Sequence, residues 1–148
     1  MNDDEIRAAV ERLVARFEAF APPDLNRLQE FYTGDAWFKD PFNEVSGLTA
    51  VRGVYAHMFE TLEAPRFVIT DRIAQDAQCF LAWEFQFRFK RFRPKTSFTV
   101  RGSSHLKLAA DGRIRWHRDY WDTAEEMYEK LPAIGVLMRW LKAQAQSG

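Results

Sequence analysis

One stretch in the second half of the chain alternates strictly between apolar and polar side chains. From position 81 it reads LAWEFQFRFKRF. Because every second residue of a β-strand lies on the same face, this period predicts a strand with one buried face. The apolar members are Leu81, Trp83, Phe85, Phe87 and Phe89. If that face belongs to the core, Glu84 and Gln86 are solvated. If it meets a partner, they enter the interior.

Three further segments are predicted strands, over residues 66–74, 97–108 and 113–121. The last two are joined by Asp111-Gly112, a dipeptide typical of tight hairpin turns. Together with the alternating stretch, they predict a long antiparallel sheet in the second half.

The beginning of the chain follows the helical period instead. Apolar residues recur every three or four positions over 6–17, which predicts a helix capped by Asp3 or Asp4 and stopped by Pro22 and Pro23. A short helix capped by Asp24 should follow.

Three more elements complete the prediction. A brief strand is expected over 36–38, and a helix over 48–62 that Pro65 ends. Thr123 and Glu126 have the spacing of a capping box and predict a C-terminal helix.

This order of elements predicts an α+β fold, in which a curved antiparallel or mixed sheet wraps around three N-terminal helices and a C-terminal helix follows. The 148 residues suit a single domain over 1–148. Three helices cannot cover both faces of four long strands. We therefore expect the helices to fill the concave face, and a homodimer to form through the sheet.

Composition limits the partners of the chain. Lys plus Arg and Asp plus Glu both number 21, so the net charge is zero, which argues against binding to nucleic acid or an anionic membrane. Neither a signal peptide nor a run of about 18 apolar residues is evident, which favours the cytoplasm. The basic segment 87–95 interleaves cations with aromatic residues, so it either contacts bases and phosphates or is a solvated hairpin tip, and the zero net charge favours the second.

Three local strings resemble the nuclear transport factor 2-like superfamily, in its ketosteroid isomerase and SnoaL-like branch. They are YTGDAWFKDPF before a helix, ADGRI at the last hairpin and DYW at the end of the last strand. The resemblance covers nearly the whole chain and implies a cone-shaped fold with an internal pocket. That fold carries many unrelated activities, so it predicts structure better than reaction.

The resemblance also implies roles for particular residues. Asp40 falls on the general base of the isomerase branch, Tyr32 and Tyr55 on tyrosines near its site, and Trp121 on a cavity tryptophan.

Two positions depart from that branch, because Phe17 and Ser104 stand where its oxyanion-hole donors are expected. Phenylalanine donates no hydrogen bond and serine is a weaker donor than a neutral carboxylic acid, which argues against steroid isomerisation.

The candidate catalytic residues have two interpretations each. Asp40, before Pro41, is either a turn residue that accepts backbone N–H bonds or a base whose pKa is raised among aromatic neighbours. His117 and Asp119 share a strand face, which is either the cavity face or a solvated one. The hydrophobic pattern favours the second, since it groups Ile114, Trp116 and Tyr120 as the core face.

No spacing typical of a metal site, a nucleotide-binding loop or a cofactor fingerprint is present. The sequence therefore predicts a cofactor-free protein that binds a small apolar or polyketide-like molecule. Asp40, His117 and Asp119 are the candidate catalytic groups for isomerisation, cyclisation or hydrolysis. Phe17, Tyr32, Tyr55, Ser104 and Trp121 are the candidate pocket residues. The alternative is a non-catalytic ligand-binding or dimerisation module.

Overall fold

The structure is a computed structural model that describes residues 1–122, 126, 143 and 144. The C-terminal helix predicted from Thr123 onward lies outside the described residues.

Three helices precede most of the sheet. Helix α1 spans Asp3–Glu18 and is capped by Asn2, not by Asp3 or Asp4, because the side chains of Asn2 and Glu5 form a reciprocal capping box. The 3₁₀ helix η1 spans Pro22–Glu30, and its two prolines occupy the first turn, where no N–H partner is needed. Asp24 lies inside that turn and accepts the N–H of Ala21 at 2.9 Å.

Helix α2 spans Leu48–Thr61 and runs directly into the sheet. The predicted end at Pro65 is therefore too late. Strand β3 begins at Leu62, and Pro65 falls where the pairing register of β3 with β4 shifts.

Within the described part of the chain, six strands form one sheet in the order β2-β1-β6-β5-β4-β3. Their bounds are Tyr32–Lys39 for β1, Glu44–Ser46 for β2, Leu62–Gln75 for β3, Gln78–Phe89 for β4, Phe98–Leu108 for β5 and Ile114–Tyr120 for β6. Strands β1 and β6 are parallel and the other neighbours are antiparallel. The predicted strand over 36–38 is thus the inner part of β1.

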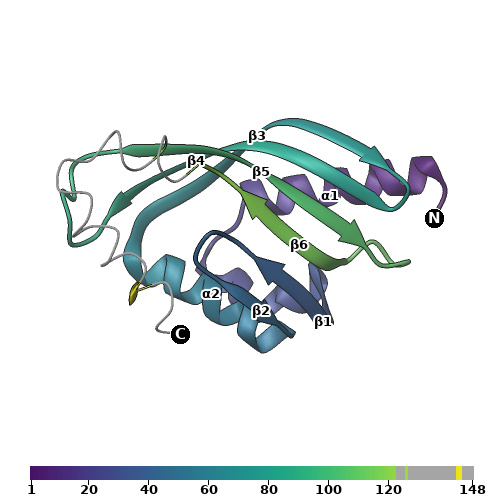
Figure 1. Cartoon of the computed structure of the whole chain (residues 1–148), viewed down its shortest axis with the longest axis horizontal. Helices are drawn as coiled ribbons and strands as arrows, with labels where there is room; N and C mark the ends of the chain where they lie inside the picture. Colours follow the sequence, from purple (N-terminus) through teal and green to yellow (C-terminus); the bar gives the residue numbers. More distant parts are fainter. Residues whose placement is uncertain (123–125, 127–142, 145–148) are drawn as a thin grey trace.

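The long strands β3, β4 and β5 curve over α1 and α2, which lie on the concave side (Figure 1). This confirms the α+β prediction of a curved mixed sheet around helices. The alternation in β4 is confirmed as well: Trp83 and Phe87 are each 6% exposed on the concave face. Glu84 points the other way and lies 3.8 Å from Arg101 of β5.

Strand β6 contains one extra residue relative to β5. Leu108 pairs with Ile114, whereas Lys107 pairs with Trp116, so that Arg115 has no partner on β5. Such a β-bulge changes which side chains face each side of a sheet from that point onward.

The bulge decides the inner face of β6. Ile114 and His117 are both buried, although they are three residues apart. Trp116 is half-buried and Tyr120 is 44% exposed. The expectation that Ile114, Trp116 and Tyr120 share a core face is therefore wrong, because a strict period of two does not cross a bulge.

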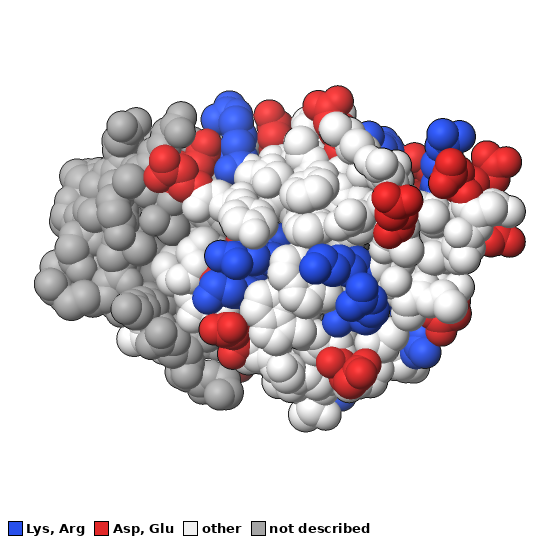
Figure 2. Space-filling model, turned by 45° about the vertical axis from the view of Figure 1, so that its right-hand side comes forward, with Lys and Arg blue, Asp and Glu red and all other residues white. Residues whose placement is uncertain are grey.

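No described helix is long and apolar enough to cross a membrane. Cationic and anionic side chains are interspersed on the face shown in Figure 2, with no broad region of one sign. This distribution agrees with the zero net charge of the sequence.

Candidate functional site

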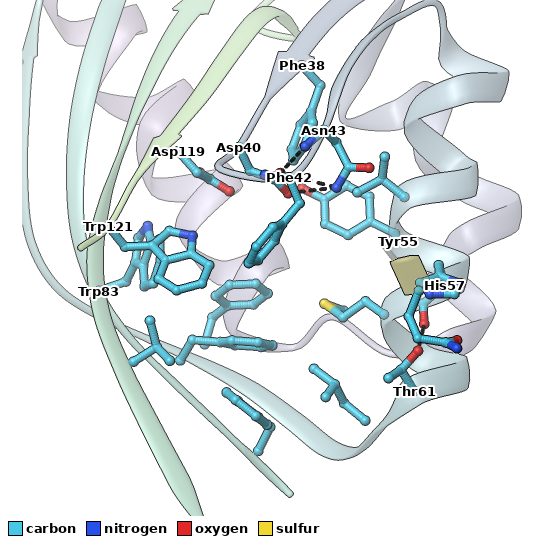
Figure 3. A pocket seen from close by; sticks show the side chains of 18 of the residues that line it. Phe38, Asp40, Phe42, Asn43, Tyr55, His57, Thr61, Trp83, Asp119 and Trp121 are labelled. Atoms are coloured by element: carbon cyan, nitrogen blue, oxygen red, sulfur yellow. Dashed lines mark hydrogen bonds between the residues drawn. The ribbon is translucent and has the colours of Figure 1, made fainter. Parts of the chain in front are cut away.

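A cavity of about 190 Å³ lies between α2 and the concave face of the sheet. Its walls are mainly aromatic and aliphatic side chains from α2, β3, β4 and β5, and the β1–β2 turn closes one end (Figure 3). The carboxylates of Asp40 and Asp119 lie at that end, close to Phe42 and Trp121. The site is an apolar hollow with two acidic groups at one end.

Asp40 follows the last residue of β1 and holds the turn into β2. Its Oδ1 accepts the backbone N–H groups of Phe42 at 2.8 Å and Asn43 at 2.7 Å, and Nδ2 of Asn43 donates to both carboxylate oxygens. The side chain also lines the cavity. The two interpretations of Asp40 are therefore compatible, since the same carboxylate accepts the backbone hydrogen bonds of the turn and faces the cavity.

Burial raises the pKa of the Asp40 carboxyl above its ordinary value of 3.8, and the negative charge of Asp119 acts in the same direction. The hydrogen bonds from Phe42 and Asn43 offset part of this effect, because they stabilise the charged form. A carboxyl with a raised pKa in an apolar cavity has the properties of a general base or acid.

Asp119 lies on the inner face of β6, beyond the bulge. Its Oδ1 is 2.6 Å from Nε2 of His117 and also accepts the hydroxyl of Ser104. Ser104 in turn accepts the indole N–H of Trp83 at 2.8 Å. Since Asp119 and Trp83 both line the cavity, these bonds fix the orientation of two cavity walls.

His117 is buried behind Asp119, at 3% exposure. Its Nδ1 is 2.8 Å from the hydroxyl oxygen of Tyr32, which is 2.7 Å from the hydroxyl oxygen of Tyr55. A continuous chain of hydrogen bonds therefore runs from Asp119 through His117 and Tyr32 to Tyr55. It begins and ends at a residue that lines the cavity.

Both tyrosines of this chain stay protonated. Burial raises the pKa of Tyr32 and of Tyr55 far above the ordinary value of 10.0, and the charge of Asp119 adds to the effect. They contribute neutral hydroxyl groups, each able to donate one hydrogen bond and to accept others.

The predicted site residues fall into three groups. Asp40, Asp119, Tyr55 and Trp121 line the cavity. His117, Tyr32 and Ser104 lie behind that lining and are hydrogen-bonded to it. Phe17 is a core residue on α1, and its ring is nearly perpendicular to that of His117, at 6.2 Å between centroids.

Sequence reasoning missed four polar residues of the cavity lining, which are Asn43, His57, Thr61 and Gln144. Asn43 holds the Asp40 carboxylate, and the turn sequence DPFN gives the only signal for it. His57 lines the α2 side, with Nδ1 at 3.6 Å from Glu60, and its Nε2 is buried with no hydrogen-bond partner among the described residues.

Over the described part of the chain, no three His, Cys, Asp or Glu side chains gather in a way that could hold a metal ion.

A family model for the SnoaL-like domain matches residues 10–117. No curated protein sequence matches the chain.

Solved structures resemble the chain at low sequence identity. A protein of Catenulispora acidiphila with a ketosteroid isomerase-like fold, in complex with trimethylamine, aligns with a TM-score of 0.70 and 18% identity over 85% of this chain and 95% of that one. A protein of Shewanella denitrificans that is provisionally assigned as a SnoaL-like polyketide cyclase aligns with a TM-score of 0.67 and 15% identity, over 84% of this chain and 94% of that one. AclR of Streptomyces galilaeus, provisionally assigned as a hydroxylase, aligns with a TM-score of 0.67 and 17% identity, over 88% of this chain and 100% of that one. Similarity at these identities shows the fold alone.

Proposed function

Since the chain belongs to the SnoaL-like domain family of the nuclear transport factor 2-like superfamily, we propose that it is a cofactor-independent enzyme. It transfers a proton on a small, largely apolar substrate, with Asp40 as the acid/base group. The observation that carries this proposal is the Asp40 carboxyl with a raised pKa in an apolar cavity.

The hydrogen bonds around His117 support a division of roles. With neutral His117, Nε2–H donates to the Asp119 carboxylate, so that Nδ1 accepts the hydroxyl of Tyr32. Tyr32 then accepts the hydroxyl of Tyr55. A proton that His117 takes up would reverse the two tyrosine hydroxyls, and Tyr55 would then donate toward the cavity. In this proposal Asp40 acts on the substrate, and the hydrogen-bond chain through His117 sets the direction in which the Tyr55 hydroxyl donates.

Isomerisation, cyclisation and dehydration all begin with the removal of a proton next to a carbonyl group. Family membership and the provisional polyketide cyclase among the structural neighbours favour this class of reaction. A polyketide-like carbonyl compound is therefore the proposed substrate class.

Deuterium exchange tests the proposal without knowledge of the natural substrate. The protein is incubated in D₂O with a panel of small cyclic ketones and 1,3-diketones, and deuterium uptake at carbon is followed by mass spectrometry. Asp40→Asn should slow exchange by at least about 100-fold, since general bases typically contribute that much or more. Asp111→Asn, in an exposed turn, is the control and should exchange at the wild-type rate. Undiminished exchange by Asp40→Asn would overturn the assignment of the base.

One observation favours a non-catalytic binding module as the second candidate. Asp40 accepts backbone N–H bonds from Phe42 and Asn43 and so has a sufficient structural role in the turn. A wild-type protein that binds members of the panel but exchanges none of them would support this alternative.

We also propose that a second copy of the chain covers the convex face of the sheet. Ile73, Phe80 and Tyr120 are 71%, 46% and 44% exposed. Ile73 pairs with Phe80, which pairs with His105 and stacks on its ring at 4.1 Å between centroids, so these residues form a row across the convex face. Light scattering after size exclusion should give the mass of a dimer for the wild type and of a monomer for Phe80→Lys. A monomeric wild type would contradict the proposal.

The remaining expectations stay proposals: one domain over 1–148, a cytoplasmic location and no nucleic-acid partner.

A further inference from the structure

The cavity has a one-sided charge distribution. Its described lining contains two carboxylates, Asp40 and Asp119, and neither Lys nor Arg. The other titratable side chains of the lining are Tyr55 and His57, and His57 faces Glu60. No fixed positive charge therefore faces the ligand space from the described residues.

The carboxylates are only partly compensated by their neighbours. Every hydrogen bond that Asp40 accepts among the described residues comes from an uncharged amide of Phe42 or Asn43. Asp119 has His117 as its partner, and a protonated imidazole would cancel one negative charge. Even then, the ionised Asp40 leaves an uncompensated charge beside an apolar wall, which is unfavourable without a counter-charge.

The walls of the cavity are aromatic. Phe42 and Trp121 pack edge to face at 5.5 Å between ring centroids, next to the two carboxylates. Trp83 lies beside Trp121 (Figure 3), and the ring of Phe67 lies 6.1 Å from Trp83 and 4.5 Å from Phe85 between centroids. Aromatic faces carry partial negative charge and attract cations, tryptophan most strongly.

Carboxylates and aromatic faces together select a particular ligand chemistry. A primary ammonium group is strongly hydrated and would lose most of its water in an apolar cavity. An ammonium whose nitrogen carries alkyl groups loses less water, and its alkyl groups pack on the aromatic rings while its charge faces the carboxylates. A cavity of about 190 Å³ holds the volume of about six water molecules, which fits a small molecule of this kind.

We propose that the cavity binds a small alkylated organic ammonium ion, with its charge beside Asp40 and Asp119 and its alkyl groups against Phe42, Trp83 and Trp121. This inference goes beyond the proposed function and rests on it only in taking the cavity as the ligand site. It names the charge class of the ligand, which proton transfer by Asp40 does not require.

Three probes of similar shape and different charge test the inference. Choline is the cation, 3,3-dimethylbutan-1-ol replaces its nitrogen with carbon and is neutral, and 3,3-dimethylbutanoate is the anion. Binding is measured by isothermal titration calorimetry at low ionic strength and near neutral pH. Choline should bind at least about tenfold more tightly than the neutral alcohol, and the anion should bind most weakly. Equal or tighter binding of the alcohol, or no binding of choline, would overturn the inference.

Variants locate the effect. Asp40→Asn and Asp119→Asn should each reduce the preference for choline over the alcohol. Trp121→Leu should reduce it with both carboxylates retained, which keeps a test available if an Asp variant fails to fold. Asp111→Asn is the control and should keep the wild-type preference. A preference that survives all three cavity variants would place choline elsewhere and refute the proposed site.

The two proposals fail separately. Exchange at carbon by Asp40 can be lost while choline still binds, and choline binding can be absent while exchange proceeds.

Discussion

The hydroxyl oxygen of Tyr32 lies 2.8 Å from Nδ1 of His117, deep behind the cavity wall. Both side chains are almost fully buried, so neither polar atom can turn to bulk water instead. The same hydroxyl is 2.7 Å from that of Tyr55, which makes Tyr32 the central link of the hydrogen-bond chain.

Tyr32→Phe should therefore destabilise the protein by about 1–3 kcal/mol, because it leaves buried polar atoms of His117 and Tyr55 without this partner. Urea unfolding followed by circular dichroism measures the change. Ser97→Ala removes a hydroxyl from an exposed serine ahead of β5 and should change the free energy of unfolding by less than about 0.5 kcal/mol. Equal effects of the two substitutions would mean that the chain does not stabilise the fold.

Asp40→Asn should change how stability depends on pH. The raised pKa means that the folded protein binds more protons at Asp40 than the unfolded chain does, from about pH 3.8 up to the folded pKa. The stability that Asp40 contributes is therefore present below pH 3.8 and is lost as pH rises through the folded pKa. The variant lacks this loss, so its free energy of unfolding relative to wild type should rise across that window.

Paired urea titrations at a series of pH values check this expectation. A relative stability that falls with rising pH would mean a lowered pKa for Asp40, and a flat difference would mean an unshifted one.

Asp119→Asn should lower the pKa of Asp40, because the charge of Asp119 is one of the causes that raise it. Carbon-13 NMR titration of the Asp40 carboxyl gives the pKa directly. Asp111→Asn removes a carboxylate from an exposed turn and should leave the Asp40 titration unchanged. An Asp40 titration that Asp119→Asn leaves unmoved would show that the charge of Asp119 does not contribute to the raised pKa.

Gly102→Ala should destabilise the protein by about 1–3 kcal/mol through overpacking. A Cβ atom at Gly102 would lie 2.5 Å from the Trp83 ring, 2.8 Å from the carbonyl oxygen of Tyr120 and 2.9 Å from Cβ of Trp121. Because both tryptophans line the cavity, binding of any cavity ligand should weaken as well. Thermal unfolding and calorimetry measure the two effects.

Gly53→Ala is the matched control for that substitution. Gly53 lies inside α2 with nothing within 4 Å of the added Cβ, so alanine should stabilise the protein by about 0.5–1 kcal/mol through helix propensity. A stabilising Gly102→Ala would show that the Trp83 and Trp121 walls can yield.

The layout of the fold follows from local patterns in the sequence. The alternation of β4 fixes its buried face because no bulge interrupts its pairing with β5. The helical stripes over 6–17 and 48–62 locate α1 and α2, whereas their ends depend on details that periodicity does not reveal. Asn2 takes the cap position of α1, and the chain enters β3 directly after Thr61.

The candidate site was less predictable, for two physical reasons. The inner face of β6 depends on the bulge at Arg115, which the hydrophobic pattern does not reveal. The contact between Tyr32 and His117 joins residues 85 positions apart in the sequence, and no local pattern reports such a distance. Only the resemblance to a known family suggested that these groups lie near one site.

The unpaired residue Arg115 determines which side chains of β6 face the cavity. If Arg115 paired with Lys107 and no bulge formed, the rest of β6 would shift by one position, so that Trp116 and Arg118 pointed into the hollow and His117 and Asp119 pointed outward. Every side chain would still be present, yet the acidic end would gain a cation and lose a carboxylate. In this protein, the way β6 pairs with β5 determines whether the cavity is acidic.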